Sequence, residues 1–395
     1  MKNIFFIRPT EPNRGDIISR YGLLKLASLN QNKGQIIILS NRNADEIPCS
    51  AKFVRPGPLK DLFPGFKQLR SYSRGDIVCW AVGHDLQDDS SLLKLPFLAV
   101  KFFIFRLFGM KIRIISQGAG PINTIWGRFF IKVIMALLES ASFRDTESTN
   151  LITALAPKYK NKYSTVVDSA LFATDAHKEK AKSKEGALVL GLNLRRWFHF
   201  DGHWMPYEYR VRLGLVKEVP GERKMESVMD NMAVFLDKIV QSYDIKIRMI
   251  PMYPPGIEEW EDDLKLLQHT MERMKCFKSV EISEKDMKPQ QLIEYFSELD
   301  LMIGMRLHST IIATSMGIPS IHLAYSPKGY SYFRTIGEEE YCYPVERLAE
   351  IEEPEELLAL FDKLKTNRLA ISERLLAKTE KLRGTYREQI TGSIL

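Results

Sequence analysis

The chain has 395 residues, 45% of them hydrophobic and 27% charged, with a net charge of +7 and 4 cysteines. This length suits two domains, and this composition is typical of a folded globular protein, not a disordered or membrane-spanning one. The cysteines lie far apart, which argues against a zinc site and a disulfide framework, and the modest positive charge suits an anionic substrate or membrane surface better than a nucleic acid.

The N-terminus, MKNIFFIRPT, has too few consecutive apolar residues to form the core of a secretory signal. No stretch approaches the roughly 18 uncharged apolar residues that a membrane-spanning helix needs. We therefore expect a cytoplasmic protein.

Strand-like apolar runs alternate with helix-length amphipathic segments along most of the chain. Strands are predicted at 3–9, 35–40, 76–82, 111–118 and 141–145 in the first half, and at 187–195, 246–252, 279–284, 299–305 and 319–325 in the second. Strands separated by helices indicate parallel sheets of the α/β class.

The polar, lysine-rich segment 174–186 is the best linker candidate. We predict two doubly wound, Rossmann-like domains at 1–178 and 186–366, followed by a charged helical tail at 367–395.

Ligands of such domains bind beyond the carboxyl ends of the strands, and here also in the cleft between the domains. Three polar segments follow strands of the first half: one contains Asp85, one contains Gly118 and Gly120, and one begins at Arg144. The glycine turn precedes Pro121, which suits the start of a helix, and it could present backbone N–H groups to an anion or be a packing turn. Arg144 could bind an anion or pair with Asp145 or another nearby carboxylate.

The stretch LMIGMRLHST, at 301–310, ends an apolar strand with Arg306 and His308. If the backbone stays extended beyond the strand, these two side chains point the same way, into the cleft. The planar guanidinium of arginine suits a phosphate or carboxylate, and histidine can give and take a proton near neutral pH. The alternative for His308 is a histidine packed beneath the next helix.

A window from Ser90 to Leu138 contains no acidic residue but seven basic ones, including Lys94, Lys101 and Arg106. A basic amphipathic helix can lie in a membrane interface with its cations toward anionic headgroups. The alternative is a crossover helix whose apolar face is covered by a parallel sheet.

The segment 195–210 is rich in aromatic residues, among them Trp197 and Trp204, which could stack on sugar rings, touch a membrane or form a lid between domains. His199, Asp201 and His203 lie there as well. Because Gly202 intervenes and no helical period supports the spacing, we expect no metal site.

Several segments together resemble the polysaccharide pyruvyl transferase family: NRGDIISRYGLLKL, SQGAGPI, SFRDTES, DSALF, GMRLHST and GIPSIHLAYSPKG. The resemblance covers residues 13 to 333, and its most specific parts are the R-x-H and Y-x-x-K elements. It implies two Rossmann-like domains arranged as in GT-B glycosyltransferases. It also implies transfer of pyruvate from phosphoenolpyruvate to a sugar as a ketal, without a metal or organic cofactor.

The resemblance further implies that Arg144, Arg306 and His308 surround phosphoenolpyruvate, with His308 as the acid/base residue. Lys328 is either a third cation at the donor or an exposed lysine at the start of a helix. On the acceptor side we expect Asp16, Asp85, Trp197 and Trp204. One departure is Gly83-His84-Asp85, where many members carry three glycines.

We therefore predict a pyruvyl transferase acting on a glycan of the cell envelope, or on its precursor, either free or lipid-linked, with peripheral contact at the inner membrane face through 90–138. One alternative is a GT-B glycosyltransferase that uses a nucleotide sugar. The other is a non-catalytic glycan-binding protein of the same fold.

Overall fold

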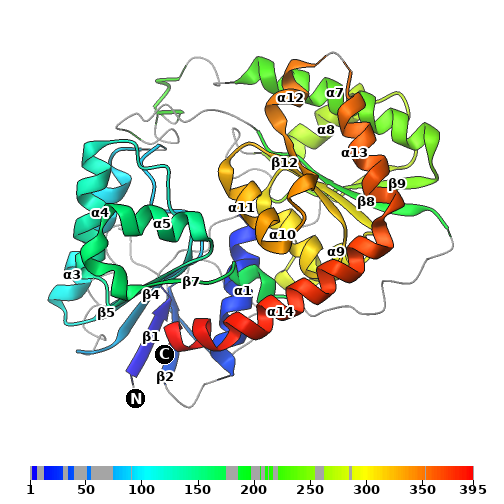
Figure 1. Cartoon of the computed structure of the whole chain (residues 1–395). Coiled ribbons are helices and arrows are strands. Elements are labelled where there is room, and N and C mark those ends of the chain that lie inside the picture. The colour runs from blue at the N-terminus through cyan, green and yellow to red at the C-terminus, as the bar shows by residue number, and fades with distance from the viewer. Residues whose placement is uncertain are drawn as a thin grey trace.

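Two parallel β-sheets, each covered by helices on both faces, make up the protein (Figure 1). The computed structural model describes residues 2–6, 13–29, 34–39, 51–54, 74–89, 91–174, 186–196, 205, 210–211, 213–216, 221–253, 262–283, 287–351 and 353–394. The fold class expected from the alternation of strands and helices is confirmed by this arrangement.

The first sheet has seven strands in the order β3-β2-β1-β4-β5-β6-β7, all parallel. Its strands are β1 (Lys2–Phe6), β2 (Gly34–Leu39), β3 (Ala51–Val54), β4 (Ile77–Ala81), β5 (Lys111–Gln117), β6 (Ser140–Phe143) and β7 (Tyr163–Thr165). Alternate residues face opposite sides, as a strand requires. Phe5 therefore packs in one buried cluster, and Ile4 and Phe6 pack in another.

Helices cover both faces of this first sheet. Residues of α3 (Lys94–Leu107), α4 (Ile125–Leu137) and α5 (Thr146–Leu155) share the cluster that contains Phe5. The other face is covered by α1 (Arg14–Ser28), the short helix η3 (Ser169–Phe172) and part of a C-terminal helix. A further short helix, η2 (Pro157–Lys162), joins α5 to β7.

The second sheet has six parallel strands in the order β10-β9-β8-β11-β12-β13. Its strands are β8 (Leu188–Asn193), β9 (Ile245–Met249), β10 (Val280–Ile282), β11 (Leu301–Gly304), β12 (Ser320–Ala324) and β13 (Cys342–Pro344). The helices around it are α7 (Glu222–Ser242), α8 (Asp263–Arg273), α9 (Pro289–Ser297), α10 (Leu307–Ser315), α11 (Pro327–Ile336), η6 (Glu339–Tyr341), α12 (Val345–Glu350) and α13 (Glu355–Thr366).

The last helix, α14 (Arg368–Ile394), returns from the second sheet to the first, as the red ribbon in Figure 1 shows. Ile390 and Ile394 are fully buried in the core of the first sheet. Arg383, in the middle of the helix, donates to the carbonyls of Leu171 and Ser315, one in each half of the chain. The segment predicted as a charged tail is thus a helix that packs one side against the protein and links both domains.

All ten strands predicted from the sequence coincide with observed strands, and three more are present: β3, β7 and β13. Each of the three is a short strand of three or four residues at an edge of its sheet. Edge strands are often short, and β7 and β13 are largely half-buried, so no long apolar run marks them in the sequence.

Candidate active site

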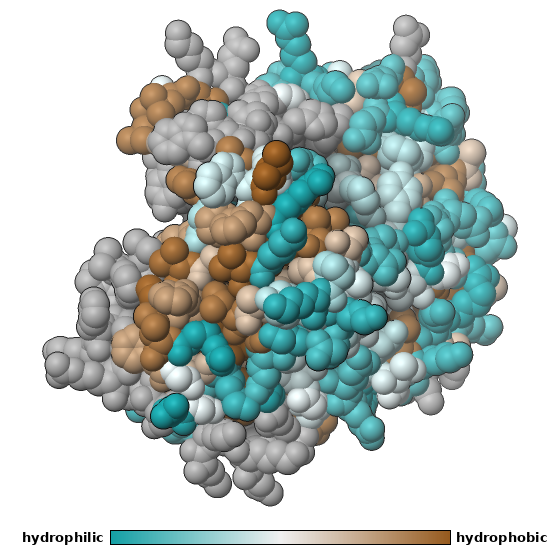
Figure 2. Space-filling view, turned by 60° about the vertical axis from the view of Figure 1, so that its left-hand side comes forward, coloured by the Kyte–Doolittle hydropathy of each residue, from teal (hydrophilic) through white to brown (hydrophobic). Residues whose placement is uncertain are grey.

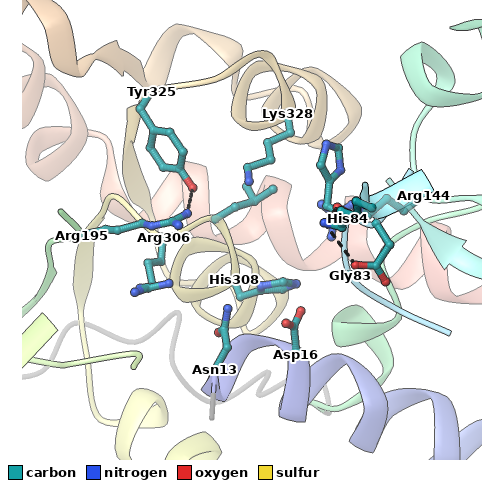
Figure 3. A pocket seen from close by; sticks show the side chains of 13 residues that line it. Asn13, Asp16, Gly83, His84, Arg144, Arg195, Arg306, His308, Tyr325 and Lys328 are labelled. Atoms are coloured by element: carbon teal, nitrogen blue, oxygen red, sulfur yellow. Dashed lines mark hydrogen bonds and ion pairs between the residues drawn. The ribbon is translucent and has the colours of Figure 1, made fainter. Parts of the chain in front are cut away.

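A cavity of about 310 Å³ lies between the two sheets. Its walls follow the carboxyl ends of β4, β6, β8, β11 and β12, the edge where parallel sheets bind ligands. Figure 3 shows side chains converging on it from all sides. The lining residues are Asn13, Asp16, Gly83, His84, Asp85, Lys94, Arg144, Arg195, Arg306, Leu307, His308, Tyr325 and Lys328. Five of these are arginines or lysines and two are aspartates, so the cavity suits an anion.

Arg306 lines the cavity, and its backbone is still extended although the strand itself has ended. β11 ends at Gly304, and Arg306 is the N-cap residue of α10. Its Nε lies 2.7 Å from Oδ2 of Asp263 and its Nη2 lies 2.8 Å from Oδ1. Both side chains are buried, so two nitrogens of the guanidinium hold a carboxylate of the protein itself.

His308 lies in the first turn of α10, so the expectation that it shares an extended segment with Arg306 is wrong. The chain turns into the helix at Leu307, yet both side chains still reach the cavity. His308 Nε2 lies 3.5 Å from Oδ2 of Asp168, in the other half of the chain. A side chain at Gly15 would overlap the imidazole, so this glycine lets α1 approach His308 closely.

Asp168 contacts side chains from three parts of the site, namely Arg144 after β6, Ser19 on α1 and His308 on α10. Its carboxylate accepts from Arg144 Nη1 at 2.8 Å and from the Ser19 hydroxyl at 2.9 Å, and it faces His308. Burial alone would raise the pKa of Asp168, but His308 and the Arg144 guanidinium hold that pKa below its usual range. The ionised carboxylate of Asp168 therefore faces the His308 ring and orients it.

Arg144 follows β6 and is buried, with its ion pair to Asp168 and not to its neighbour Asp145. Asp145 instead caps α5, where its carboxylate accepts from the backbone N–H of Ser148 at 2.6 Å. Asp168 is therefore the nearby carboxylate that sequence reasoning allowed for but did not identify. Arg144 still lines the cavity, and its role at the donor remains a prediction.

The glycine turn does not offer its N–H groups to an anion. Gly118 N–H donates to the Gly83 carbonyl at 3.0 Å, and Gly120 N–H donates to the Leu86 carbonyl at 2.7 Å. The next helix begins at Ile125, capped by Thr124, and not at Pro121. The expected anion-binding turn is thus a packing turn, whose N–H groups bind carbonyls of the protein.

Gly118 and Gly120 nevertheless position His84. A side chain at Gly118 would overlap the His84 ring and lie 3.2 Å from Nε of Arg144. The ring nitrogen Nε2 of His84 is hydrogen-bonded to the Gly120 carbonyl. Burial, together with the cations Lys328, Arg144 and Lys94, holds the pKa of His84 well below its usual value. His84 is therefore a neutral hydrogen-bonding group in a cationic cavity.

The Gly83-His84-Asp85 segment starts from a strained residue, Val82, whose φ of 58° lies in the left-handed region that β-branched side chains avoid. This left-handed conformation of Val82 turns the chain sharply at the end of β4. Asp85 then accepts from Trp80 Nε1 at 3.0 Å and lies 3.5 Å from Lys94 Nζ. Asp85 thus lines the cavity beside a cation, and its expected contact with an acceptor remains a prediction.

Tyr325, Arg195 and Lys328 form a second polar group, at the ends of β12 and β8 (Figure 3). Arg195 Nη1 donates to the Tyr325 hydroxyl at 2.7 Å, and Lys328 Nζ lies 5.3 Å from the centre of the Tyr325 ring. Burial would raise the pKa of Tyr325, but Arg195, Lys328 and Arg306 outweigh it and lower that pKa to about 7. Burial lowers the pKa of Lys328, and Arg195 and Arg144 lower it further, while Tyr325 acts in the opposite direction.

The start of α1 forms the floor of the cavity in Figure 3, where Asn13 and Asp16 point toward His308. Asn13 is the N-cap, and its side chain accepts from the backbone N–H of Gly15 at 2.9 Å. Arg14 Nη1 donates to the Pro251 carbonyl at 2.6 Å, which ties α1 to the second domain. Asp16 is buried in the cavity wall, and its expected role in binding an acceptor remains a prediction.

A second cavity, of about 500 Å³, also has Tyr325 in its wall. It is lined by Glu147, Ala324, Tyr325, Ser326, Pro327, Tyr330, Ser331, Arg334 and Glu346. Arg334 Nη1 lies 2.8 Å from Oε1 of Glu147, so the two domains also meet here. Among the described residues, Tyr325 is the one that lines both cavities.

Trp197 and Trp204, predicted on the acceptor side, lie outside the described residues. So do His199, Asp201 and His203, for which no metal site was expected. Sequence reasoning did not single out Asp168, Arg195 or Tyr325 as site residues. The signal for Asp168 and Tyr325 was present in DSALF and in the Y-x-x-K element, but nothing local shows that these residues face His308 and Arg195.

Comparison with protein families gives one match: the model of the polysaccharide pyruvyl transferase family matches residues 13–327. No curated protein sequence matches the chain.

Solved structures share the fold at low sequence identity. The UDP complex of S. aureus MnaA has a TM-score of 0.59 at 11% identity, over 99% of this chain and 98% of that one. Anabaena HepE with UDP and glucose has a TM-score of 0.58 at 13% identity, over 99% and 98%. A glycosyltransferase from Rickettsia africae has a TM-score of 0.56 at 11% identity, over 98% of both chains. These neighbours are GT-B glycosyltransferases and epimerases, so the predicted GT-B-like arrangement of two domains is confirmed.

Proposed function

The chain belongs to the polysaccharide pyruvyl transferase family, and from this premise we propose that it transfers pyruvate from phosphoenolpyruvate to a sugar of a cell-envelope polysaccharide or its precursor. The observation that carries the proposal is the cavity itself. It brings five cations together with His308, on an ionised aspartate, at the carboxyl ends of two sheets.

The donor is proposed to bind among the cations. Phosphoenolpyruvate presents a carboxylate and a phosphate, and an arginine fork suits either group. Arg144 and Arg195 approach the cavity from opposite domains, with Lys328 between them (Figure 3). Arg306 contributes its positive charge, while two of its nitrogens hold Asp263. The bound anion would bridge the domains.

His308 is the proposed proton donor. Transfer begins when a proton from the imidazolium adds to the methylene carbon of phosphoenolpyruvate, which leaves a cationic centre at the adjacent carbon. A hydroxyl of the acceptor attacks that centre, phosphate leaves with its bonding electrons, and a second hydroxyl closes the ketal. Of the two hydroxyl protons released, one replaces the proton that His308 gave and the other leaves with phosphate. Asp168 keeps His308 oriented throughout.

Tyr325 is the proposed activator of the acceptor hydroxyl. It lines both cavities, and a pKa of about 7 makes its phenolate available at neutral pH. The second cavity offers carboxylates and hydroxyl groups from Glu147, Ser331 and Glu346, which suit a sugar. Donor and acceptor would then meet across Tyr325. The scheme uses side chains of this chain alone and calls for no metal or organic cofactor.

A nucleotide-sugar donor is the alternative, because the compared structures of S. aureus MnaA and Anabaena HepE were solved with UDP. At 11% and 13% identity these structures share the fold and carry no argument about the donor. A non-catalytic glycan-binding protein remains the other alternative.

Thermal unfolding with each donor separates these alternatives. A ligand that binds only the folded protein stabilises it by about 2.7 kcal/mol at 100 times its Kd. We expect phosphoenolpyruvate to raise the Tm and UDP or a UDP-sugar to leave it unchanged. Arg144→Ala should abolish the shift, whereas Arg347→Ala, which removes an exposed arginine paired with Glu356, should keep it. A shift with UDP alone would identify a nucleotide-sugar enzyme, and a shift with neither would remove the donor assignment.

A further inference from the structure

The outer surface of α3 and α4 carries a concentration of exposed apolar side chains. Figure 2, turned to bring this side of the first domain forward, shows a broad hydrophobic area. Eight of the fourteen large apolar residues that are exposed in the described part of the chain lie here. We call the following residues the α3–α4 face: Leu93, Val100, Phe103, Leu107, Phe108, Ile125, Trp126 and Phe129.

Helix geometry explains why this surface is apolar although α3 also packs on the sheet. Phe102 and Phe105 point into the core and are buried, as the sheet-covered alternative predicted. Val100, Phe103 and Leu107 follow a spacing of three and four residues and form a second, exposed stripe. An amphipathic surface helix normally has a polar outer face, so an apolar outer face indicates a partner.

Aromatic residues are grouped at the start of α4. The Trp126 ring stacks on Phe130 with centroids 5.8 Å apart, and Phe129 meets Phe130 edge to face at 5.2 Å. The Trp126 side chain is nevertheless 64% exposed. Exposed tryptophan and phenylalanine beside basic residues are typical of segments that lie in a membrane interface.

The charges around the face are of one sign. The sequence from Ser90 to Leu138 has no acidic residue. Lys94 belongs to the cavity, and Lys101 is buried with its Nζ 4.9 Å from the centre of the Trp80 ring. These two lysines, expected from the sequence to attract a membrane, are therefore not available to one, which corrects that assignment.

The cations that do face outward are Arg106, Arg128 and Lys132, all exposed. Within the described residues no carboxylate pairs with them. Arg128 and Lys132 are one helical turn apart on α4, and Arg106 lies near the end of α3, next to Leu107. Apolar side chains framed by cations without acidic neighbours match the chemistry of an anionic lipid surface.

We propose that the α3–α4 face docks this protein on the surface of a membrane that contains anionic phospholipid. The apolar and aromatic side chains enter the boundary between headgroups and acyl chains, while the three cations contact lipid phosphates. Among the described helices none is long and apolar enough to cross a bilayer. The contact is peripheral and weakens at high salt.

Docking would also place the cavity near the bilayer. Lys94, at the first turn of α3, lines the cavity, and Leu107 ends the same helix. A helix of this length spans about 21 Å. If the proposed transfer of pyruvate is correct, this closeness favours an acceptor carried on a lipid. The docking itself does not depend on the reaction.

Flotation with lipid vesicles tests the proposal. The intact chain should float with vesicles that contain phosphatidylglycerol at low salt, and less with pure phosphatidylcholine or at high salt. Replacing Arg106, Arg128 and Lys132 by Glu should lower the bound fraction roughly 100-fold. The matched control replaces Arg223, Lys246 and Lys278, exposed cations of the second domain, and should bind like the wild type. Equal loss in both triple variants would indicate a nonspecific charge effect and overturn the proposal.

The fluorescence of Trp126 and the oligomeric state complete the test. Anionic vesicles should shift tryptophan emission to the blue, and Trp126→Phe should remove most of that shift. A wild-type protein that stays with the soluble fraction at low salt would overturn the proposal. So would a dimer in lipid-free solution that Trp126→Glu converts to a monomer, because the face would then bind a second copy. The phosphoenolpyruvate-induced Tm shift, measured on each variant, shows separately whether the donor site is intact.

Discussion

Two buried aspartates hold arginines on opposite sides of the cavity, and their surroundings differ. Asp263 pairs with Arg306 and accepts from the backbone N–H groups of Met252 and Tyr253 at 3.0 and 3.1 Å. All of these partners belong to the second domain. Asp168 pairs with Arg144 in its own domain and faces His308 across the domain boundary.

We infer from this difference that the Asp263–Arg306 pair serves the fold, and we propose that the Asp168–Arg144 pair serves the reaction. The carboxylate of Asp263 is enclosed by its partners and is only 1% exposed, and it fixes the loop after β9 against the start of α10. The carboxylate of Asp168 holds two side chains that line the cavity, one of which can carry a proton. Similar burial and the same pairing with arginine therefore support different roles.

The largest effect should come from His308. His308→Ala removes the proposed proton donor, so we expect phosphate release from phosphoenolpyruvate, with cell-envelope glycan precursors as acceptors, to fall about 10²–10⁴-fold. The Tm shift caused by phosphoenolpyruvate should persist, and His308→Gln should not restore the rate. Near-normal turnover of a folded His308→Ala protein would contradict this role. His308 and Asp168 would then be structural residues, like Arg306 and Asp263.

Arg306→Ala should act on stability instead. It leaves the Asp263 carboxylate buried without its cation, which should lower the free energy of unfolding by roughly 3–5 kcal/mol in urea titrations. The double variant Arg306→Met, Asp263→Leu should recover only part of that loss, because no buried charge remains but the N–H groups of Met252 and Tyr253 lose their acceptor. As a control, Arg347→Ala breaks an exposed pair and should cost less than about 1 kcal/mol. A small loss in Arg306→Ala would indicate that Arg306 is held for the ligand and not for the fold.

Asp168→Asn sharpens the comparison, because it keeps the shape of the side chain and removes its charge. Without the anion His308 loses the charged group that orients it, so turnover should fall on the order of 10²-fold. Asp263→Asn should instead lower stability and leave the turnover of the folded fraction unchanged.

The smallest effect concerns Tyr325. Since its pKa is lowered to about 7 by Arg195, Lys328 and Arg306, kcat/KM should rise with pH through about 7 as the phenolate forms. Bound phosphoenolpyruvate brings negative charge, which disfavours the phenolate of Tyr325. The corresponding rise of kcat, the alkaline-going limb of its pH profile, should therefore occur at higher pH. Tyr325→Phe should remove this limb and lower the rate by about 10²-fold or less. An unchanged limb in Tyr325→Phe would assign it to another group.

Much of the fold could be predicted from the sequence alone. Buried parallel strands appear as apolar runs, as at 77–81 and 301–304, because both of their faces are covered. The position of polar residues after such runs also located Arg144, Arg306 and His308 at the edge where both sheets meet the cavity. These inferences succeed because the hydrophobic period and the direction of a parallel strand are local properties.

The tertiary structure alone decided how those residues are used. Arg144 and Asp168 are 24 residues apart, and Arg306 and Asp263 are 43 apart, so no local pattern shows which carboxylate each arginine meets. The N–H groups of Gly118 and Gly120 bind carbonyls that the sequence does not place beside them. Lys101 and Arg106 lie on one helix, yet one is buried against Trp80 and the other faces outward. Charge and hydrogen bonding depend on the whole surroundings of a group, and packing of distant segments creates those surroundings.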